Sequence, residues 1–202
     1  MSDGFGKYDV YTDFASLYCY HDSHVLKNRY QIRDAETLRK LEQDYVGAKQ
    51  QYLLEHPIPG RFTPTHLCNI HRFLFGDIYP FAGHYRLESI RKGDTVFVRP
   101  QDIGPKLQTL LLDLRRESFL VGYPRGTYIE RFAYYLAELN YIHPFREGNG
   151  RATREFFRLL VIKNQYTVDW MAAGRTALLD AMAISLYDTT ALRKVLEQCI
   201  SK

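Results

Sequence analysis

The apolar positions of this chain recur mainly with the period of a helix. Asp34 is a residue type that caps helices, and the residues at helical spacing after it are Thr37, Leu38, Leu41, Tyr45, Ala48 and Tyr52. A proline and glycine cluster at 57–60 ends this helix. Thr63-Pro64 predicts the start of a second helix, because proline fits the first helical turn. The inward positions of that helix are Leu67, Ile70 and Leu74.

Four more helical stretches follow, at 101–119, 126–141, 150–164 and 174–199, the last with a break near Asp188. In the stretch 126–141, one face carries Ile129, Phe132, Ala133, Leu136, Leu139 and Asn140. In the stretch 150–164, the corresponding residues are Phe156, Phe157, Leu160 and Val161. We expect these two helices to lie in the core and to pack against each other.

The stretch 84–99 has a different pattern. His84 to Ile90 is extended in character, Lys92-Gly93-Asp94 is a turn signal, and Thr95-Val96-Phe97-Val98 is a β-branched and aromatic run. This pattern predicts one small β-hairpin. Because a lone hairpin is marginal in water, it is either a structural tab on a helical body or a flap over a site.

The organisation that follows is an irregular N-terminal arm at 1–33, which lacks clear periodicity, and a single domain at 34–202. The fold class is all-α, with the one hairpin as its β-structure.

Composition narrows the classes of protein to consider. The chain has 202 residues, 46% of them apolar and 25% charged, which is typical of a soluble globular protein and argues against disorder. The formal charge of +4 does not cluster, so we expect no direct binding of nucleic acid. No segment reaches the ~20 apolar residues of a membrane helix, and the N-terminus lacks the apolar part of a secretory signal. The odd, widely spaced Cys19, Cys68 and Cys199 favour free thiols in a reducing cytoplasm.

The loop between the two predicted core helices carries the candidate chemistry. Pro144 ends the first helix, which leaves His143 at a helix C-terminus beside the loop. Gly148 and Gly150 allow backbone N–H groups to approach a ligand, and Asn149 is suited to cap the next helix. The N-terminus of that helix favours a phosphate group.

Two arginines extend this anion site. Arg151 and Arg154 share one helix face, away from the apolar face, and guanidinium groups pair well with phosphate oxygens. Arg158, which continues the same stripe, is expected to be solvated. Glu147 would repel a phosphate unless Mg²⁺ lies between them. His143 titrates near neutral pH and can take a proton from a hydroxyl. Together these residues indicate transfer of a phosphoryl or nucleotidyl group to a hydroxyl, although each alone is more often structural.

The segment HPFREGNGRATR, residues 143–154, resembles the signature of the Fic family, His-Pro-Phe-x-(Asp/Glu)-Gly-Asn-Gly-Arg-x-x-Arg, at every specified position. Residues 26–30 resemble the entry of many bacterial Fic domains. Residues 70–83 resemble the helix and loop before the family's hairpin, where Trp is common in place of Phe81, and residues 83–86 lead into the hairpin as in the family.

The resemblance implies a helical domain that transfers AMP from ATP to a Ser, Thr or Tyr hydroxyl of a target protein. By position, His143 would be the general base, Phe145 would anchor the loop, and Glu147 would hold Mg²⁺. Gly148, Asn149 and Gly150 would form the anion hole, with Arg151 on the β-phosphate and Arg154 on the γ-phosphate. A flap would dock the target by strand pairing; its residues would be Gly93, Asp94, Thr95, Val96, Phe97 and Val98.

The resemblance also bears on regulation. Many Fic proteins carry an inhibitory helix of pattern (Ser/Thr)-x-x-x-Glu-(Gly/Asn), but the only Glu followed by Gly or Asn here is Glu147, inside the loop. The chain therefore resembles the toxin half of a bacterial Fic toxin–antitoxin pair, with a small antitoxin protein supplying a Glu to Arg154. An intracellular target such as a DNA gyrase or topoisomerase IV subunit would follow.

Other functions stay open at this point. Gly150 favours nucleotidyl transfer, since the phosphorylating Doc-type branch has Lys there, but transfer of another phosphate-containing group such as phosphocholine is an alternative. A catalytically silent module that binds a phosphorylated partner is a second alternative, although pure anion binding needs neither His143 nor Glu147. A DNA-binding helical protein is disfavoured by the even spread of charge.

Overall fold

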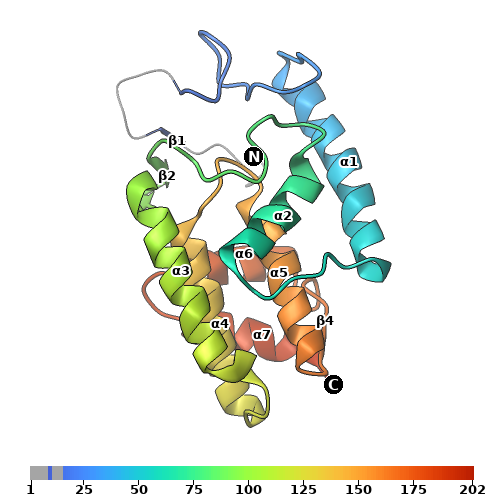
Figure 1. Ribbon diagram of the computed structural model, residues 1–202, viewed down its shortest axis with the longest axis vertical. Coiled ribbons are helices and arrows are strands. Elements are labelled where there is room, and N and C mark those ends of the chain that lie inside the picture. Colours follow the sequence, from blue (N-terminus) through green and yellow to red (C-terminus); the bar gives the residue numbers. More distant parts are fainter. Residues whose placement is uncertain (1–8, 11–15) are drawn as a thin grey trace.

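The computed structural model describes residues 9–10 and 16–202. Over these residues the chain forms helices joined by loops and two small antiparallel sheets (Figure 1). The helices are α1 (Ala35–Glu55), α2 (Pro64–Phe75), α3 (Pro100–Arg116), the 3₁₀ turn η1 (Ser118–Leu120), α4 (Arg125–Ile142), α5 (Asn149–Lys163), α6 (Arg175–Ile184) and α7 (Thr190–Cys199). The expected all-α class is confirmed. Part of the predicted arm, residues 1–8 and 11–15, lies outside the described residues.

The β-structure is slightly richer than predicted. The expected hairpin is present as β2 (Ile90–Lys92) and β3 (Thr95–Val96), and β1 (Asp9–Val10) pairs with β2 on its other side. A second sheet joins β4 (Thr167–Val168) to β5 (Ile200–Ser201), two segments far apart in the sequence. β1, β4 and β5 have two residues each, which is too short to show an alternating pattern, so the sequence does not predict them.

The predicted helix starts are confirmed by their caps. The carboxylate of Asp34 accepts a hydrogen bond from the backbone N–H of Thr37 at 2.8 Å. The hydroxyl of Thr63 accepts from the N–H of His66 at 3.3 Å, and Pro64 follows it in the first turn. Each cap satisfies an amide that has no partner within its own helix, which fixes where the helix begins.

The buried face of α1 differs from the stripe noted in the sequence. Leu38, Val46 and Leu53 are buried, whereas Tyr45 and Tyr52 are exposed. Tyr45 packs against the exposed ring of Tyr30, and Tyr52 packs against the half-buried ring of Phe73. Because tyrosine is amphipathic, helical spacing of its rings does not by itself identify the inward face.

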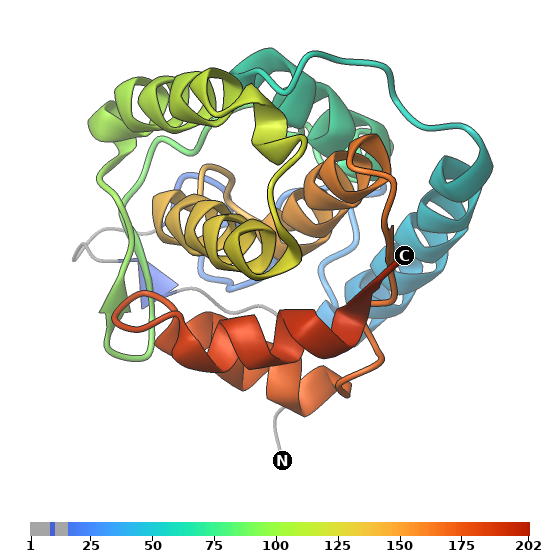
Figure 2. The same ribbon diagram turned by 90° about the horizontal axis from the view of Figure 1, so that it is seen from below.

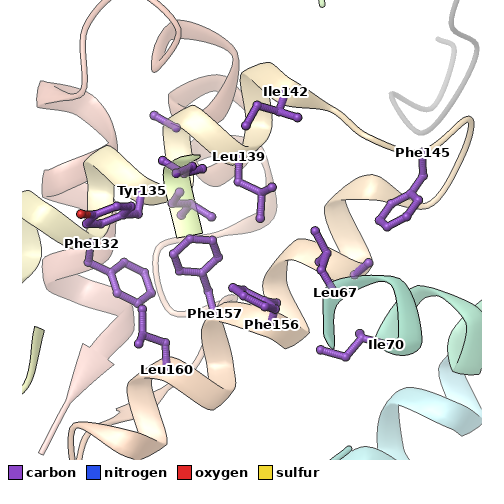
Figure 3. Close-up of a cluster of buried hydrophobic side chains, with 14 of the residues drawn as sticks. Leu67, Ile70, Phe132, Tyr135, Leu139, Ile142, Phe145, Phe156, Phe157 and Leu160 are labelled. Atoms are coloured by element: carbon purple, nitrogen blue, oxygen red, sulfur yellow. The ribbon is translucent and has the colours of Figure 1, made fainter. Parts of the chain in front are cut away.

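The two predicted core helices lie in the middle of the molecule. Figure 2 shows α4 and α5 surrounded by α1, α2, α3, α6 and α7. α4 packs on α3, α5 and α7, and α5 also packs on α2. Figure 3 shows Phe132 of α4 next to Phe157 and Leu160 of α5, and all three side chains are buried. The predicted apolar faces are confirmed, except that Asn140 is only half-buried and donates to the carbonyl of Met182.

The C-terminal region has the predicted break. α6 ends at Ile184 and α7 begins at Thr190, and between them the carboxylate of Asp188 accepts from the N–H of Thr190 at 2.9 Å. All three cysteines are free, with Cys68 less buried than the other two. In residues 9–10 and 16–202, no helix combines the length and the apolar character needed to cross a bilayer.

His66, at the start of α2, provides a pH-dependent contribution to stability. Its ring is buried, its Nδ1 accepts from the N–H of Phe62 at 3.3 Å, and its Nε2–H donates to the carbonyl of Ile58 at 2.9 Å. This arrangement needs the neutral ring. Burial lowers the pKa of His66 below its ordinary value of 6.5.

We predict that the free energy of unfolding falls as pH drops below 6.5, because His66 then binds a proton in the unfolded chain but stays neutral in the folded protein. The slope from this ring is at most about 1.4 kcal/mol per pH unit. Denaturant unfolding at a series of pH values between 7.5 and about 5 gives the free energy of unfolding as a function of pH. The slope of this free energy against pH should be smaller for His66→Gln than for wild type. The exposed His24 is the control: His24→Gln should keep the wild-type slope. Equal slopes for His66→Gln and wild type would contradict the assignment.

Candidate functional site

The backbone turns sharply at the end of α4 and presents His143. This residue has φ of 46°, in the left-handed region, and its N–H donates to the carbonyl of Leu139 at 3.1 Å, which closes the helix. Pro144 cannot continue the helix, as the sequence predicts. The buried guanidinium of Arg86 then holds the last carbonyls of α4: its Nε donates to His143 O at 2.9 Å and its Nη2 to Ile142 O at 3.4 Å.

The ring of His143 is held in one orientation and one tautomer. It lies parallel to the ring of Phe97 with 3.9 Å between the ring centres, and its Nδ1–H donates to the carbonyl of Asn140 at 2.9 Å. In this tautomer Nε2 carries the lone pair. Burial lowers the pKa of His143 to about 3, so the ring is neutral at physiological pH. The ring carries its single proton on Nδ1 and can accept a second one on Nε2. The expectation that His143 titrates near neutral pH is therefore wrong, because burial disfavours its charged form.

Asn149 fixes the shape of the loop rather than capping α5. Its side-chain oxygen accepts from the N–H of Phe145 and its amide nitrogen donates to the carbonyl of Phe145, both at 2.8 Å. Gly148 is the residue at the cap position, with φ of 77° and no side-chain cap. The predicted capping role of Asn149 is therefore wrong, because both of its polar groups are already used within the loop.

The loop is also tied to α2 through Phe145 and His71. Phe145 is buried, as expected of an anchor, and stacks on the His71 ring with 3.8 Å between the ring centres. His71 Nδ1 accepts from the N–H of Gly83 and its Nε2–H donates to the carbonyl of Glu147, both at 2.8 Å. Burial lowers the pKa of His71 to about 3, which keeps this neutral, two-sided arrangement. Sequence reasoning did not single out His71, although it lies within the segment that resembles the family.

The first turn of α5 provides amides and two guanidiniums. The N–H of Ala152 is bonded to Gly148 O at 3.1 Å, so the amides of Asn149, Gly150 and Arg151 come before the first intrahelical bond. The N–H of Gly148 donates to the carboxylate of its neighbour Glu147 at 2.8 Å. Of the predicted anion-hole residues, Gly148 is thus engaged by Glu147, whereas Gly150 lies in the turn where helix amides face outward.

Arg151 and Arg154 differ sharply in their partners. Arg151 Nη2 lies 2.6 Å from a carboxylate oxygen of Glu42 on α1. Arg154 has no hydrogen bond or ion pair with any residue that the structure describes, and its Nη1 lies 3.2 Å from the position that a Cβ on Gly150 would take. Burial, together with Arg151 and Arg175, lowers the pKa of Arg154 to about 10, so it remains charged at neutral pH. An unpaired, largely desolvated cation is poised to bind an anion.

Arg158 corrects another expectation. Instead of being solvated, its guanidinium donates to the carboxylate of Glu155 at 2.7 Å and to the carbonyl of Leu53 at 2.7 Å. It connects α5 to the end of α1 and takes no part in the site.

Glu147 meets the requirements of a cation ligand only in part. Its side chain is 13% exposed, and burial and the nearby Glu42 carboxylate raise its pKa. No cluster of three or more His, Cys, Asp or Glu side chains is found among residues 9–10 and 16–202. One hard oxygen ligand suits Mg²⁺, which is commonly held by one or two carboxylates together with the phosphates of a substrate. The residues therefore fit Mg²⁺ bound together with a polyphosphate.

A buried ion pair joins the loop to the base of the hairpin. Arg146 Nε lies 2.7 Å from a carboxylate oxygen of Glu88, and both side chains are at most 7% exposed. Glu88 precedes β2 and also accepts from the hydroxyl of Ser16 at 2.7 Å and the N–H of Leu17 at 3.1 Å. No local pattern indicates this pair, because its members are 58 residues apart.

The predicted flap lies beside His143. Gly93 and Asp94 form its exposed tip, Thr95 and Val96 form β3 at the edge of the sheet, and Phe97 and Val98 return to the body. Phe97 covers the His143 ring, and the N–H of Val98 donates to the carbonyl of Tyr141 at 3.3 Å. The structure thus brings the end of the hairpin, at Phe97 and Val98, to the end of α4 beside the loop.

Gly148 offers a direct test of how tightly the loop is packed. A Cβ at Gly148 would lie 2.3 Å from Cζ of Phe75, in addition to the strain of its φ of 77°. Gly122 has a similar φ of 83°, but nothing lies within 4 Å of its Cβ position.

We predict that Gly122→Ala costs about 1–2 kcal/mol from the left-handed backbone alone. Gly148→Ala should cost about 1–3 kcal/mol more, because Phe75 must also move. Denaturant unfolding of the two variants measures the difference. Equal losses would mean that Phe75 does not restrain the loop.

Comparison with known proteins agrees with this geometry. The model of the Fic/DOC family matches residues 61–161. "Protein adenylyltransferase VbhT" of Bartonella schoenbuchensis is 34% identical over 191 residues, which cover 95% of this chain and 38% of VbhT. "Probable protein adenylyltransferase Fic" of Salmonella typhimurium is 33% identical over 203 residues, which cover 100% of this chain and 98% of that protein.

Solved structures show the same likeness. The crystal structure of BepC from Bartonella tribocorum, with bound AMPPNP, superimposes with a TM-score of 0.79 at 27% sequence identity, covering 91% of this chain and 95% of that chain. The segment that the family model matches, residues 61–161, contains α2, the hairpin, α3, α4 and nearly all of α5, and therefore the whole loop between α4 and α5. The chain belongs to the Fic/DOC family.

Proposed function

We propose that this protein is an adenylyltransferase that moves AMP from ATP to a Ser, Thr or Tyr hydroxyl of a target protein. The observation that carries the proposal is Arg154: a charged, largely desolvated guanidinium without a partner among the described residues, one turn from the N-terminal amides of α5. The relatives VbhT and Fic are named protein adenylyltransferases, and the BepC structure holds AMPPNP.

The first step is binding of the triphosphate. The N-terminal amides of α5 and its dipole favour phosphate oxygens, and Gly150 keeps this turn open. We assign the β-phosphate to Arg151 and the γ-phosphate to Arg154, as the resemblance to the Fic signature implies; the two arginines share one face of α5. Glu147 would hold Mg²⁺ against the phosphates, and this cation would neutralise charge on the phosphate oxygens.

The second step is transfer. The target hydroxyl lies against His143, and its oxygen attacks the α-phosphorus in line with the bond to the leaving group. A new bond forms between that oxygen and the α-phosphorus, the bond between the α-phosphorus and the bridging oxygen breaks, and pyrophosphate leaves. Nε2 of His143 takes the hydroxyl proton. The bond from Nδ1–H to Asn140 O fixes the tautomer that this step needs, with the lone pair on Nε2.

The target is held by the hairpin in this proposal. β3 is the edge strand of its sheet, and Val96 on it is 48% exposed. An extended segment of the target can add to this edge through backbone hydrogen bonds, which would bring its hydroxyl to the side of Phe97 and His143.

We test transfer with α-labelled ATP, Mg²⁺ and a bacterial lysate. Wild type should label one or a few proteins, with a +AMP adduct by mass spectrometry, whereas His143→Ala should lower labelling by at least about 100-fold because the base is lost. His24→Ala, at an exposed histidine, should label like wild type. No label with folded wild type would instead favour a silent phosphate-binding module. An adduct of different mass would identify transfer of another group.

We also propose that the protein is a toxin of the bacterial cytoplasm, restrained by a separate antitoxin. The support is again Arg154, which no carboxylate of residues 9–10 and 16–202 reaches within salt-bridge distance. A small partner that supplies a Glu to Arg154 would occupy the position assigned to the γ-phosphate. The proposed target is a gyrase or topoisomerase IV subunit.

Expression in a bacterium tests this role. Wild type alone should stop growth, and both His143→Ala and co-expression of an antitoxin should restore it. Arg193→Ala, at a surface arginine outside the site, should be as toxic as wild type. Normal growth with abundant folded wild type would contradict the toxin proposal while leaving the transfer assay to decide the enzymatic one.

A further inference from the structure

Helix α1 brings to the site a carboxylate that is not part of the loop motif. Glu42 is on the inward side of α1, four residues after the buried Leu38 and four before the buried Val46. One of its oxygens lies 2.6 Å from Nη2 of Arg151, a residue 109 positions away in the sequence. Both side chains are largely buried, at 13% and 14% exposed. This ion pair is therefore shielded from solvent and from salt.

The second oxygen of Glu42 is engaged as well. It accepts a hydrogen bond from the hydroxyl of Tyr79, which lies just after α2 and is 3% exposed. Burial raises the pKa of Tyr79, so its hydroxyl keeps the proton that it donates. With one oxygen on Tyr79 and the other on Arg151, the carboxylate has a defined direction. Tyr79 thus fixes Glu42, and Glu42 in turn fixes the guanidinium.

The guanidinium of Arg151 is held on its face too. Its central carbon lies 4.7 Å from the centre of the Phe75 ring, the same ring that would meet a side chain at Gly148. Two carboxylates approach this guanidinium through the same nitrogen, Nη2: that of Glu42 at 2.6 Å and that of Glu147 at 3.6 Å. An arginine fork has further N–H donors on Nε and Nη1. The contacts fix the plane of the group and leave donors for a second anion.

We propose that Glu42 is a positioning residue that orients Arg151 toward the β-phosphate of the nucleotide. The inference rests on the proposed function, since it assigns Arg151 to that phosphate. It is distinct from an inhibitory Glu, because Glu42 pairs with Arg151, whereas no described residue pairs with Arg154. A carboxylate already engaged on both oxygens acts as a fixed support for the guanidinium rather than as a competitor for its free donors.

Comparison of ADP with AMP tests the proposal, since only ADP has a β-phosphate. Isothermal titration of Glu42→Gln with ADP and with AMP, in the presence of Mg²⁺, should show about 5- to 20-fold weaker ADP binding. AMP binding should change less than about 2-fold, because AMP has no β-phosphate for Arg151 to bind. Tyr79→Phe, which leaves the Glu42–Arg151 pair in place, should weaken ADP binding in the same selective way and by a smaller factor.

The matched control is Glu36→Gln, on the same helix at an exposed Glu that pairs with the exposed Lys40. It should bind both nucleotides like wild type. Two results for Glu42→Gln would overturn the proposal. One is an equal loss of ADP and AMP affinity, which is a purely structural effect. The other is an ADP affinity equal to or higher than that of wild type. If Glu42→Gln does not fold, the ratio of ADP to AMP affinity of Tyr79→Phe decides in the same way. Failure of the proposed function is recognised separately, because folded wild type would then label no protein in the transfer assay.

Discussion

The site depends on how the chain turns between α4 and α5. The two ends of this connection, His143 and Gly148, both have φ in the left-handed region, at 46° and 77°. Such turns are unfavourable for most residues and persist only when the surroundings hold them. Here the two hydrogen bonds between Asn149 and the backbone of Phe145 close the loop on itself. The same turn sets the imidazole at one helix end and the amides at the next.

Buried polar side chains that contact the loop keep it in this one conformation. His71 holds the carbonyl of Glu147, Arg86 holds the carbonyl of His143, and Glu88 holds Arg146. A buried polar group without its partner is costly, so each of these contacts opposes any other loop conformation. The neutral state of His71 is part of this support, since its ring must both donate and accept.

The sequence predicted those parts of the structure that depend on local chemistry. The caps at Asp34 and Thr63 and the break near Asp188 could be found because each is a contact within a few residues. Contacts over long distances could not be found in this way. Glu42 meets Arg151 only because α1 packs beside the core, and the bond from Arg158 to the carbonyl of Leu53 also joins two helices. The pair of Arg158 with Glu155 is local, but the spacing alone did not show that it would be buried. The role of Asn149 was misjudged because the same side chain suits a cap and a loop closure.

The aromatic cover of the imidazole has a consequence for the choice of nucleophile. Phe97 lies flat on the His143 ring, which is 6% exposed. In the proposed reaction, this apolar ring limits the access of bulk water to the base. A protein segment aligned on β3 brings its own hydroxyl to the imidazole, whereas a water molecule must enter without such guidance. The hairpin would therefore reduce wasteful hydrolysis of ATP as well as hold the substrate.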